Sequence, residues 1–390
     1  MTKNNSFDVD TICIHGAHKN NEPGSPVREP IVLSNIYHLP KDEEPNWSGV
    51  GHGIYTRNGS DNQFSLEAKM AAIENAQDCA LFASGVAALS AVFWTFLPTG
   101  SHVICSKVCY AAVNKLFGGM LTERYKIEAD FVDTTNINEI KNHIKENTKL
   151  IHVETPGNPT TGISDISEIS KLAKAHNILL SVDGTFASPI YQKPLDLGAD
   201  ISIHSMTKYI NGHGDAMGGC VCSTKEIIEK IKLGAMINTG GIISPFNAWI
   251  IDRGLMTLPL RMEKHSNNAM EIAEFLQNQN NVTFVYYPGL ESHPQHKLAL
   301  KQMSGFSGML CFGIKGDDIK QKVFLNKLSL ITYALSLGDT DTLIVHTSKN
   351  DAKIKNYPSE FQNGFFRMSV GLESSNDIIS DLKYSLYNYL

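Results

Sequence analysis

Short apolar runs alternate with helical patterns between residues 61 and 225, and this alternation constrains the fold more than any other feature of the sequence. Each run is short enough to be a buried strand. The runs lie at 80–83, 102–105, 150–153, 178–182 and 201–203. Between two of them, from Ser164 to His176, apolar residues repeat at helical spacing, and Asp165 with Glu168 fits a helix start. This order predicts a mainly parallel sheet with helices on both faces.

The first 60 residues contain many residues that break helices and strands. These breakers are Pro23, Pro26, Pro30, Pro40, Pro45, Gly49, Gly51 and Gly53. The composition predicts an extended arm rather than a packed layer. Because such an arm has little core of its own, we expect it to lie on another surface, such as that of a second subunit.

A different pattern begins near residue 250. A helical pattern runs from Met262 to Gln277, and we expect His265, Asn267 and Asn268 on its polar side. Strand-like runs follow at 282–286, 309–312 and 365–370. The sequence therefore predicts an α/β protein in three parts. These are an N-terminal arm (1–60), a large domain with a mainly parallel sheet flanked by helices (61–250) and a smaller α+β domain (251–390).

The composition argues against several classes of protein. Seven cysteines in 390 residues are an odd number in a long chain, so a disulfide framework is not expected, and their spacing is unlike that of zinc sites. The formal net charge of -6 comes without a basic block, so neither nucleic acid nor an anionic membrane is an expected partner. The polar N-terminus is unlike a secretory signal, and no apolar run reaches the roughly 20 residues that span a bilayer. We expect a cytoplasmic protein with reduced thiols and no metal site.

One lysine stands in a setting that suits covalent chemistry. Lys208 follows an apolar strand and the two hydroxyls of Ser205 and Thr207, and a glycine-rich stretch from Asn211 to Gly219 comes next. A lysine at a strand end that is shielded from solvent has a lowered pKa and can form a Schiff base. The two hydroxyls can donate to a phosphate. An isolated lysine of this kind would be read as a surface residue, so the interpretation depends on the neighbouring motifs.

Three further motifs follow predicted strands. Asp183 ends an apolar run, where open α/β sheets bind ligands, and a carboxylate there can keep a pyridinium nitrogen protonated. Gly85 lies between a strand and an apolar helix, where free backbone N–H groups can bind an anion. Asn158, in the segment from Glu154 to Thr160, can present its amide to a ligand oxygen. A turn or a cap would also explain each motif taken alone.

Together, and in this order, the four motifs resemble the Cys/Met metabolism family of fold-type-I pyridoxal-phosphate (PLP) enzymes. The resemblance extends from about Ile12 to the C-terminus. Its most specific part is the stretch from Asp200 to Gly219, with HSMTKYINGHGDAMGG. It implies the fold of PLP-dependent transferases of fold type I, with PLP as the cofactor.

The resemblance also implies how individual residues hold the cofactor. Lys208 matches the lysine that is joined to the cofactor and moves protons. Asp183 matches the partner of the pyridine nitrogen, and Asn158 matches the ligand of the phenolic oxygen. The residues that match the phosphate cradle are Gly85, Val86, Ser205 and Thr207.

Other matches concern the substrate and a second subunit. Tyr110 matches the aromatic residue that stacks on the ring and can assist departure of the leaving group. Ser336 and Arg367 match the groups that hold the substrate α-carboxylate, which an arginine can do bidentately. Tyr55 and Arg57 match a pair that reaches the phosphate of the neighbouring subunit's cofactor. We therefore expect a homotetramer built from two catalytic dimers.

Residues around this site restrict the set of candidate reactions. Leu335 precedes Ser336, where cystathionine γ-lyases and γ-synthases commonly carry Glu, and a leucine suits a methylthio group or another short uncharged tail. This favours γ-elimination of the methionine γ-lyase kind, which yields 2-oxobutanoate, ammonia and a thiol. Ala112 stands where many methionine γ-lyases carry cysteine, and the loop from Thr347 to Pro358 departs from the family pattern.

Three alternatives therefore stay open. The first is a cystathionine γ-lyase or homocysteine desulfhydrase. The second is a γ-replacement enzyme, namely a cystathionine γ-synthase or an O-acetylhomoserine sulfhydrylase. The third is a PLP-binding protein without catalysis. The non-catalytic alternative is disfavoured because the chain keeps all four catalytic-type residues, Lys208, Asp183, Tyr110 and Arg367.

Overall fold

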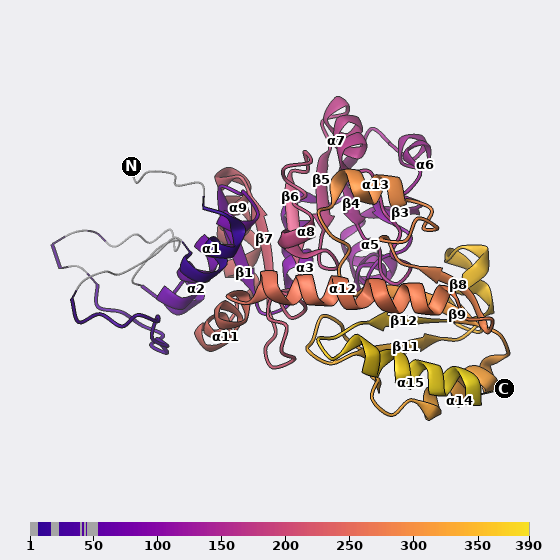
Figure 1. Cartoon of the computed structure of the whole chain (residues 1–390). Coiled ribbons are helices and arrows are strands. Elements are labelled where there is room, and N and C mark those ends of the chain that lie inside the picture. Colours follow the sequence, from indigo (N-terminus) through magenta and orange to yellow (C-terminus); the bar gives the residue numbers. More distant parts are fainter. Residues whose placement is uncertain (1–6, 17–22, 40, 43, 45–53, 390) are drawn as a thin grey trace.

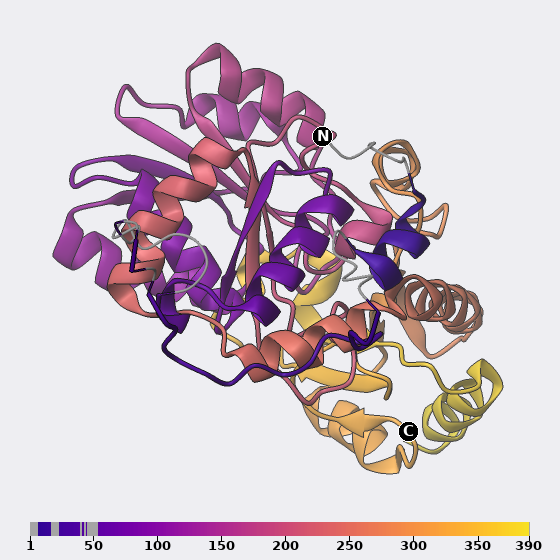
Figure 2. The same cartoon turned by 90° about the vertical axis from the view of Figure 1, so that its left-hand side faces the viewer.

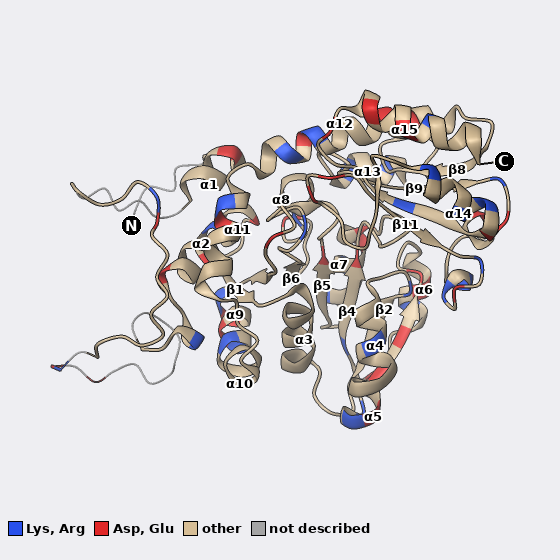
Figure 3. Ribbon diagram, turned by 90° about the horizontal axis from the view of Figure 1, so that it is seen from below, with Lys and Arg blue, Asp and Glu red and all other residues tan. Residues whose placement is uncertain are grey.

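The computed structural model describes residues 7–16, 23–39, 41–42, 44 and 54–389 (Figure 1). Five breakers of the predicted arm, Pro40, Pro45, Gly49, Gly51 and Gly53, lie outside these residues. Within the described part of the chain, no helix is both long enough and apolar enough to cross a bilayer. Positively and negatively charged residues both occur on neighbouring elements, as the blue and red segments of the ribbon show (Figure 3).

A seven-stranded sheet forms the centre of the large domain. Its strands are β1 (Asp78–Phe82), β2 (His102–Ser106), β3 (Glu128–Val132), β4 (Thr148–Glu154), β5 (Leu179–Asp183), β6 (Ile201–His204) and β7 (Gly219–Ser223). Their order is β1-β7-β6-β5-β4-β2-β3, and only β7 runs against the others. The prediction of a mainly parallel sheet is confirmed, and each of the five apolar runs overlaps one of its strands. Neither β3 nor β7 was predicted, because β3 is half-exposed and β7 starts inside the glycine-rich stretch.

Alternating side chains of the strands are buried against helices on both faces. Val103 and Cys105 point to the face covered by α3 (Gly85–Phe96) and α9 (Lys225–Ile231), whereas Ile104 points to the face of α7 (Ile166–Ala175). Asp165 caps α7 by accepting from Glu168 N at 3.0 Å, so the predicted helix start is confirmed. The other helices of this part are α2 (Asp61–Ile73), α4 (Ala111–Lys115), α5 (Leu121–Tyr125), α6 (Ile137–Asn142), α8 (Ser188–Tyr191), α10 (Ile237–Thr239) and α11 (Pro245–Leu255).

The N-terminal region is only in part the extended arm that its composition predicts. Residues 23–39 contain no helix and expose apolar side chains such as Val27 and Leu33. In Figure 2 this indigo segment runs along the face of the body that is turned toward the viewer. It is held there where Trp249 Nε1 of α11 donates to Glu29 O at 2.8 Å. The prediction is wrong for α1 (Val9–His15), because Cys13 is buried where this short helix packs on the body.

The chain then enters α12 (Leu258–Gln277), a long helix that runs from the large domain along the C-terminal sheet (Figure 1). That sheet has the order β10-β11-β12-β9-β8. Its strands are β8 (Val282–Tyr286), β9 (Met309–Ile314), β10 (Thr332–Tyr333), β11 (Leu343–Thr347) and β12 (Phe365–Ser369), and its helices are α13 (His296–Gln302), α14 (Asp318–Lys327) and α15 (Ser375–Asn388). The division at residues 60 and 250 stays a prediction.

The prediction of a polar, exposed face on α12 is wrong for two residues. His265 and Asn268 are buried rather than exposed. His265 Nδ1 lies 2.7 Å from Val370 O, and Asn268 Nδ2 donates to Gly371 O at 3.0 Å. Their polar atoms satisfy backbone carbonyls just after β12, which is why polar side chains occur on the buried face.

Arg261, also on α12, anchors the segment that carries Lys208. Its guanidinium is buried and donates to Tyr209 O at 2.6 Å, Ile210 O at 3.2 Å and Gly254 O at 2.9 Å. One side chain therefore supplies donors to three buried carbonyls. The packing of α12 and the placement of the Lys208 segment depend on each other.

We predict that Arg261→Met lowers the free energy of unfolding by about 3 kcal/mol or more, because each buried carbonyl left without a donor costs roughly 1–3 kcal/mol. Urea unfolding followed by circular dichroism measures this loss. Arg261→Lys keeps one donor group, so its free energy of unfolding should lie between those of the wild type and Arg261→Met. A Met variant as stable as the wild type would contradict the anchoring role.

Candidate active site

The carboxyl ends of β4, β5 and β6 place the predicted site residues at one edge of the large sheet. Glu154 and Asp183 are the last residues of β4 and β5 and are partners in the parallel ladder. Ser205 follows β6 directly, and Lys208 lies three residues further on. Parallel strands that end together bring their last residues to a common crevice, where ligands of open α/β sheets bind.

Lys208 points to the C-terminal domain rather than to solvent. Its Nζ donates to Ser336 Oγ at 2.8 Å. Burial lowers the pKa of the Lys208 amine, and the positive charge of Arg367 also lowers it, although Asp339 acts in the opposite direction. A lowered pKa increases the share of neutral amine, which is the form that reacts with a carbonyl group.

Arg367 joins the two domains at this point. From β12, its Nη1 donates to Asn158 Oδ1 at 3.0 Å and its Nη2 donates to Ser336 O at 2.8 Å. Its Nε is buried and has no hydrogen-bond partner among the described residues. Ser336 has a φ of 97°, in the left-handed region that favours glycine. The structure thus brings Lys208, Ser336, Arg367 and Asn158 into one cluster, with an unused N–H of the arginine beside it.

Asp183 Oδ2 makes no hydrogen bond with the residues that the structure describes, so it can accept a cationic partner. The carboxylate is buried, and Oδ1 accepts from Thr185 N at 3.0 Å and from Thr185 Oγ1 at 2.6 Å. Among the described residues, both of these bonds use the same oxygen. Burial raises the pKa of Asp183, and the bonds from Thr185 and the charge of His204 oppose the rise. A fixed carboxylate with a free Oδ2 suits a protonated ring nitrogen.

The N-terminus of α3 lies against the segment after β6. Gly85 is the first residue of this helix, and a Cβ there would come within 2.7 Å of Ser205 Cβ. Ser84 caps the helix by accepting from Ala87 N at 3.2 Å, and Val86 follows Gly85. Thr207 is held by Gly218, whose N donates to its Oγ1 at 3.1 Å. Backbone N–H groups and hydroxyls at a helix start fit a phosphate group.

The remaining predicted residues lie at the surface of the single chain. Tyr110 begins α4 and is half-exposed, and Leu335 next to Ser336 is 81% exposed. Tyr55 and Arg57 lie before α2, with the Arg57 guanidinium carbon 5.0 Å from the centre of the Tyr55 ring. This pair shares no hydrogen bond or ion pair with the Lys208 cluster within the described residues. The structure therefore gathers the cofactor-side residues but leaves Tyr55 and Arg57 apart.

Glu154 is a site residue for which the sequence analysis proposed no role. Its Oε2 accepts from Tyr110 N at 2.6 Å and its Oε1 accepts from Asn158 N at 2.8 Å. Burial and the charge of Asp183 raise the pKa of Glu154 well above its ordinary value. The carboxylate thus fixes the backbone at both Tyr110 and Asn158. Its position at the start of the Glu154–Thr160 motif, directly at a strand end, was the available signal.

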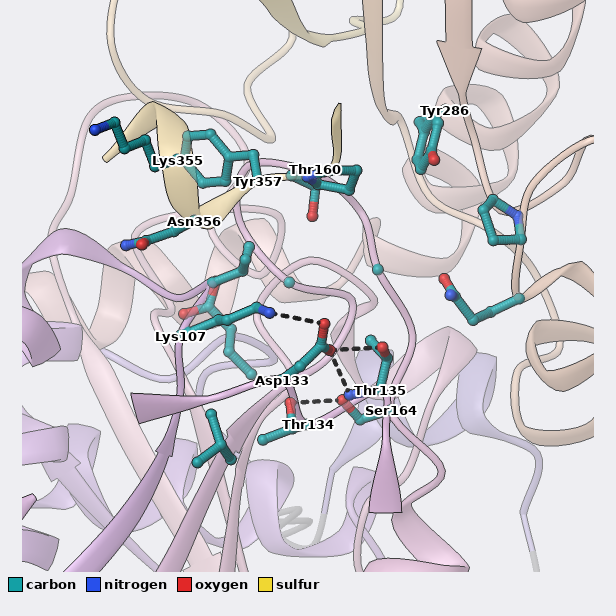
Figure 4. Close-up of a pocket in the computed structure, with 18 residues that line it drawn as sticks. Lys107, Asp133, Thr134, Thr135, Thr160, Ser164, Tyr286, Lys355, Asn356 and Tyr357 are labelled. Carbon is teal, nitrogen blue, oxygen red and sulfur yellow. Dashed lines mark hydrogen bonds and ion pairs between the residues drawn. The ribbon is translucent and has the colours of Figure 1, made fainter. Parts of the chain in front are cut away.

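A pocket adjoins this site (Figure 4). Its volume is about 390 Å³, and Glu154 and Gly157 form part of its wall, whereas Lys208 does not line it. Lys107 Nζ lies 3.0 Å from Asp133 Oδ2 on one side, and Tyr357 comes from the loop that departs from the family pattern. That loop therefore borders the back of the Glu154–Thr160 segment.

Comparisons with known proteins show what the whole chain is similar to. A family model described as "Cys/Met metabolism PLP-dependent enzyme" matches residues 10–387. A canavanine γ-lyase of Rhizobium leguminosarum bv. trifolii is 46% identical over 386 residues, which are 98% of this chain and 96% of the relative. An L-methionine γ-lyase of Fusobacterium nucleatum subsp. polymorphum is 44% identical over 339 residues, 85% of this chain and 86% of the relative. The crystal structure of cystathionine γ-lyase from Lactobacillus plantarum with L-serine superposes with a TM-score of 0.89 at 32% identity, covering 98% of this chain and 99% of that one.

We predict that Glu154→Gln weakens binding of PLP and lowers kcat/KM, each by about tenfold, because the amide replaces one of two acceptors with a donor and costs roughly 1–3 kcal/mol. Fluorescence titration of the cofactor-free protein measures the affinity. Glu139→Gln is the matched control, because Glu139 Oε2 also accepts one backbone N–H, from Asp133 at 2.8 Å. Equal effects of the two substitutions would contradict the role of Glu154.

Proposed function

The chain belongs to the Cys/Met metabolism family of PLP-dependent enzymes and is a lyase of that family, and from this premise we propose that it catalyses γ-elimination from an amino acid. The carrying observation is that Lys208, Asp183, Asn158 and Arg367 converge beside the α3 N-terminus in a chain whose described relatives include γ-lyases of three kinds. The residue roles that follow belong to this proposal.

PLP, when bound, accepts the electrons released at the substrate α-carbon. Oδ2 of Asp183 would keep the ring nitrogen protonated, and the α3 N-terminus with Gly85, Val86, Ser205 and Thr207 would hold the phosphate. Arg367 and the Ser336 hydroxyl bind the substrate α-carboxylate, for which the unpartnered Nε of Arg367 offers a donor. The Lys208 amine would hold the cofactor and would move protons between substrate carbons. Tyr110 would stack on the ring and assist departure of the leaving group.

The residue beside Ser336 bears on which substrate side chain the enzyme accepts. Leu335 is apolar and adjoins Ser336, which supports a short uncharged tail such as the methylthio group of methionine. Canavanine is a second candidate, because canavanine γ-lyases at 46% identity cover 98% of this chain. Its tail carries a guanidino group on oxygen, which needs an acidic or polar partner rather than a leucine.

The assembly belongs to the same proposal. Exposed apolar side chains on residues 23–39, among them Val27, Leu33 and Ile36, need a covering surface. A neighbouring subunit supplies it, and Tyr55 with Arg57 then reaches that subunit's cofactor. We propose a homotetramer of two catalytic dimers, acting in the cytoplasm, where its seven free cysteines stay reduced.

We predict that the wild type has a higher kcat/KM for methionine or homocysteine than for cystathionine, because burial of a methylthio group against Leu335 contributes roughly 1–3 kcal/mol. Leu335→Glu should reverse or narrow this preference and leave the cofactor spectrum unchanged. The assay follows 2-oxoacid and ammonia with methionine, homocysteine, cystathionine, canavanine, cysteine and O-acetylhomoserine. A wild-type preference for canavanine would select the second candidate, and a preference for cystathionine would contradict both.

We predict further that mixing Arg57→Ala with Lys208→Ala protein restores activity that neither has alone. Random exchange makes half of the dimers hybrids with one intact site, so recovery should reach about a quarter of wild-type activity. Subunit exchange is verified first by native mass spectrometry of labelled chains. Verified exchange without recovery would show that the two residues act in the same subunit's site.

A further inference from the structure

Three cysteines meet on the large sheet and take no part in the Lys208 cluster. Cys79 on β1 is the direct ladder partner of Cys222 on β7, and Cys220 lies two residues before Cys222. Residues two apart on a strand project to the same face, as do direct partners on neighbouring strands. All three thiols therefore lie on the face that α2 covers, and all are fully buried.

The three sulfur atoms are close enough to share one ion. They lie within 4.8 Å of one another. The centre of a triangle with sides of that length is about 2.8 Å from each corner, and Zn–S bonds are about 2.3 Å long. Small rotations of the side chains close this difference. Within the described chain, the other cysteines, including the equally buried Cys105 on β2, belong to no such group.

A carboxylate lies near this group, although it is not among the atoms that lie within 4.8 Å of one another. His204 on β6 is the ladder partner of Cys220, and its Nε2 lies 2.5 Å from Glu74 Oε1 at the end of α2. Glu74 Oε2 is buried and has no hydrogen-bond partner among the described residues. A buried carboxylate oxygen without a partner is costly unless a cation or donor satisfies it.

We propose that Cys79, Cys220 and Cys222 bind one thiophilic d¹⁰ cation, of the Zn²⁺ or Cd²⁺ class, at a structural site separate from the cofactor. Thiolates select such soft ions over Mg²⁺ or Ca²⁺. The ion ties β1, which is an edge strand, to β7. The spacing of Cys220 and Cys222 is unlike that of zinc sites in sequence, because the third ligand comes from a strand 141 residues earlier in the chain.

The test measures metal retained by the reduced holoenzyme. Protein is produced in medium with added Zn²⁺, so that the ion can bind before the site closes, then gel-filtered and subjected to elemental analysis. A parallel sample is incubated with Cd²⁺, and the thiolate-to-metal ultraviolet absorption is recorded. We expect about one ion per chain in the wild type and in the control Cys105→Ala, and at least a tenfold loss in Cys220→Ala.

A second measurement covers the case in which Cys220→Ala does not fold. Metal-loaded and chelator-treated wild-type protein are unfolded in urea under reducing conditions, and the two midpoints are compared. An ion that binds the folded chain stabilises it, so we expect the chelator to lower the midpoint. Metal content equal in wild type and Cys220→Ala, or equal midpoints with and without the chelator, overturns the proposal and leaves three small apolar side chains packed together.

Discussion

The parallel register of β4, β5 and β6 is the constraint on which the rest of the structure depends. Because these strands end at one level, Glu154, Asp183 and Ser205 arrive at the same edge of the sheet without any loop having to place them. The helix dipole of α3 meets that edge from the neighbouring crossover. Rigid strand ends, rather than flexible segments, thus determine the positions of the charged groups.

Arg367 connects these strand ends to the C-terminal domain. A single guanidinium bonds the side chain of Asn158 in one domain and the backbone of Ser336 in the other, and Ser336 in turn accepts from Lys208. Arg261 supports the same region from behind through the carbonyls of Tyr209 and Ile210. The segment of the lysine is therefore supported by two arginines, and burial together with the charge of Arg367 lowers the pKa of the Lys208 amine.

How far the sequence predicted this arrangement depends on the range of each interaction. Lys208 and Asp183 were visible because each follows its own apolar strand, and the sheet followed from local periodicity. The link from Glu154 to Tyr110 could not be seen, because it joins segments 44 residues apart through a backbone N–H. His265 was assigned to a polar face because nothing local shows that a carbonyl at Val370 needs a donor. The three-thiol group depends on the pairing of β1 with β7, which periodicity does not reveal.

Position 336 shows how this packing limits amino-acid substitution during evolution. Its left-handed backbone would suit glycine, but glycine has no hydroxyl for Lys208. Threonine would keep the hydroxyl, yet a β-branched residue is worse in that conformation than serine. Serine keeps the hydroxyl and tolerates the left-handed backbone better than threonine does. A substitution to glycine loses the hydroxyl, and a substitution to threonine strains the backbone. We expect this position to drift slowly, while its exposed neighbour Leu335 is free to vary with the substrate.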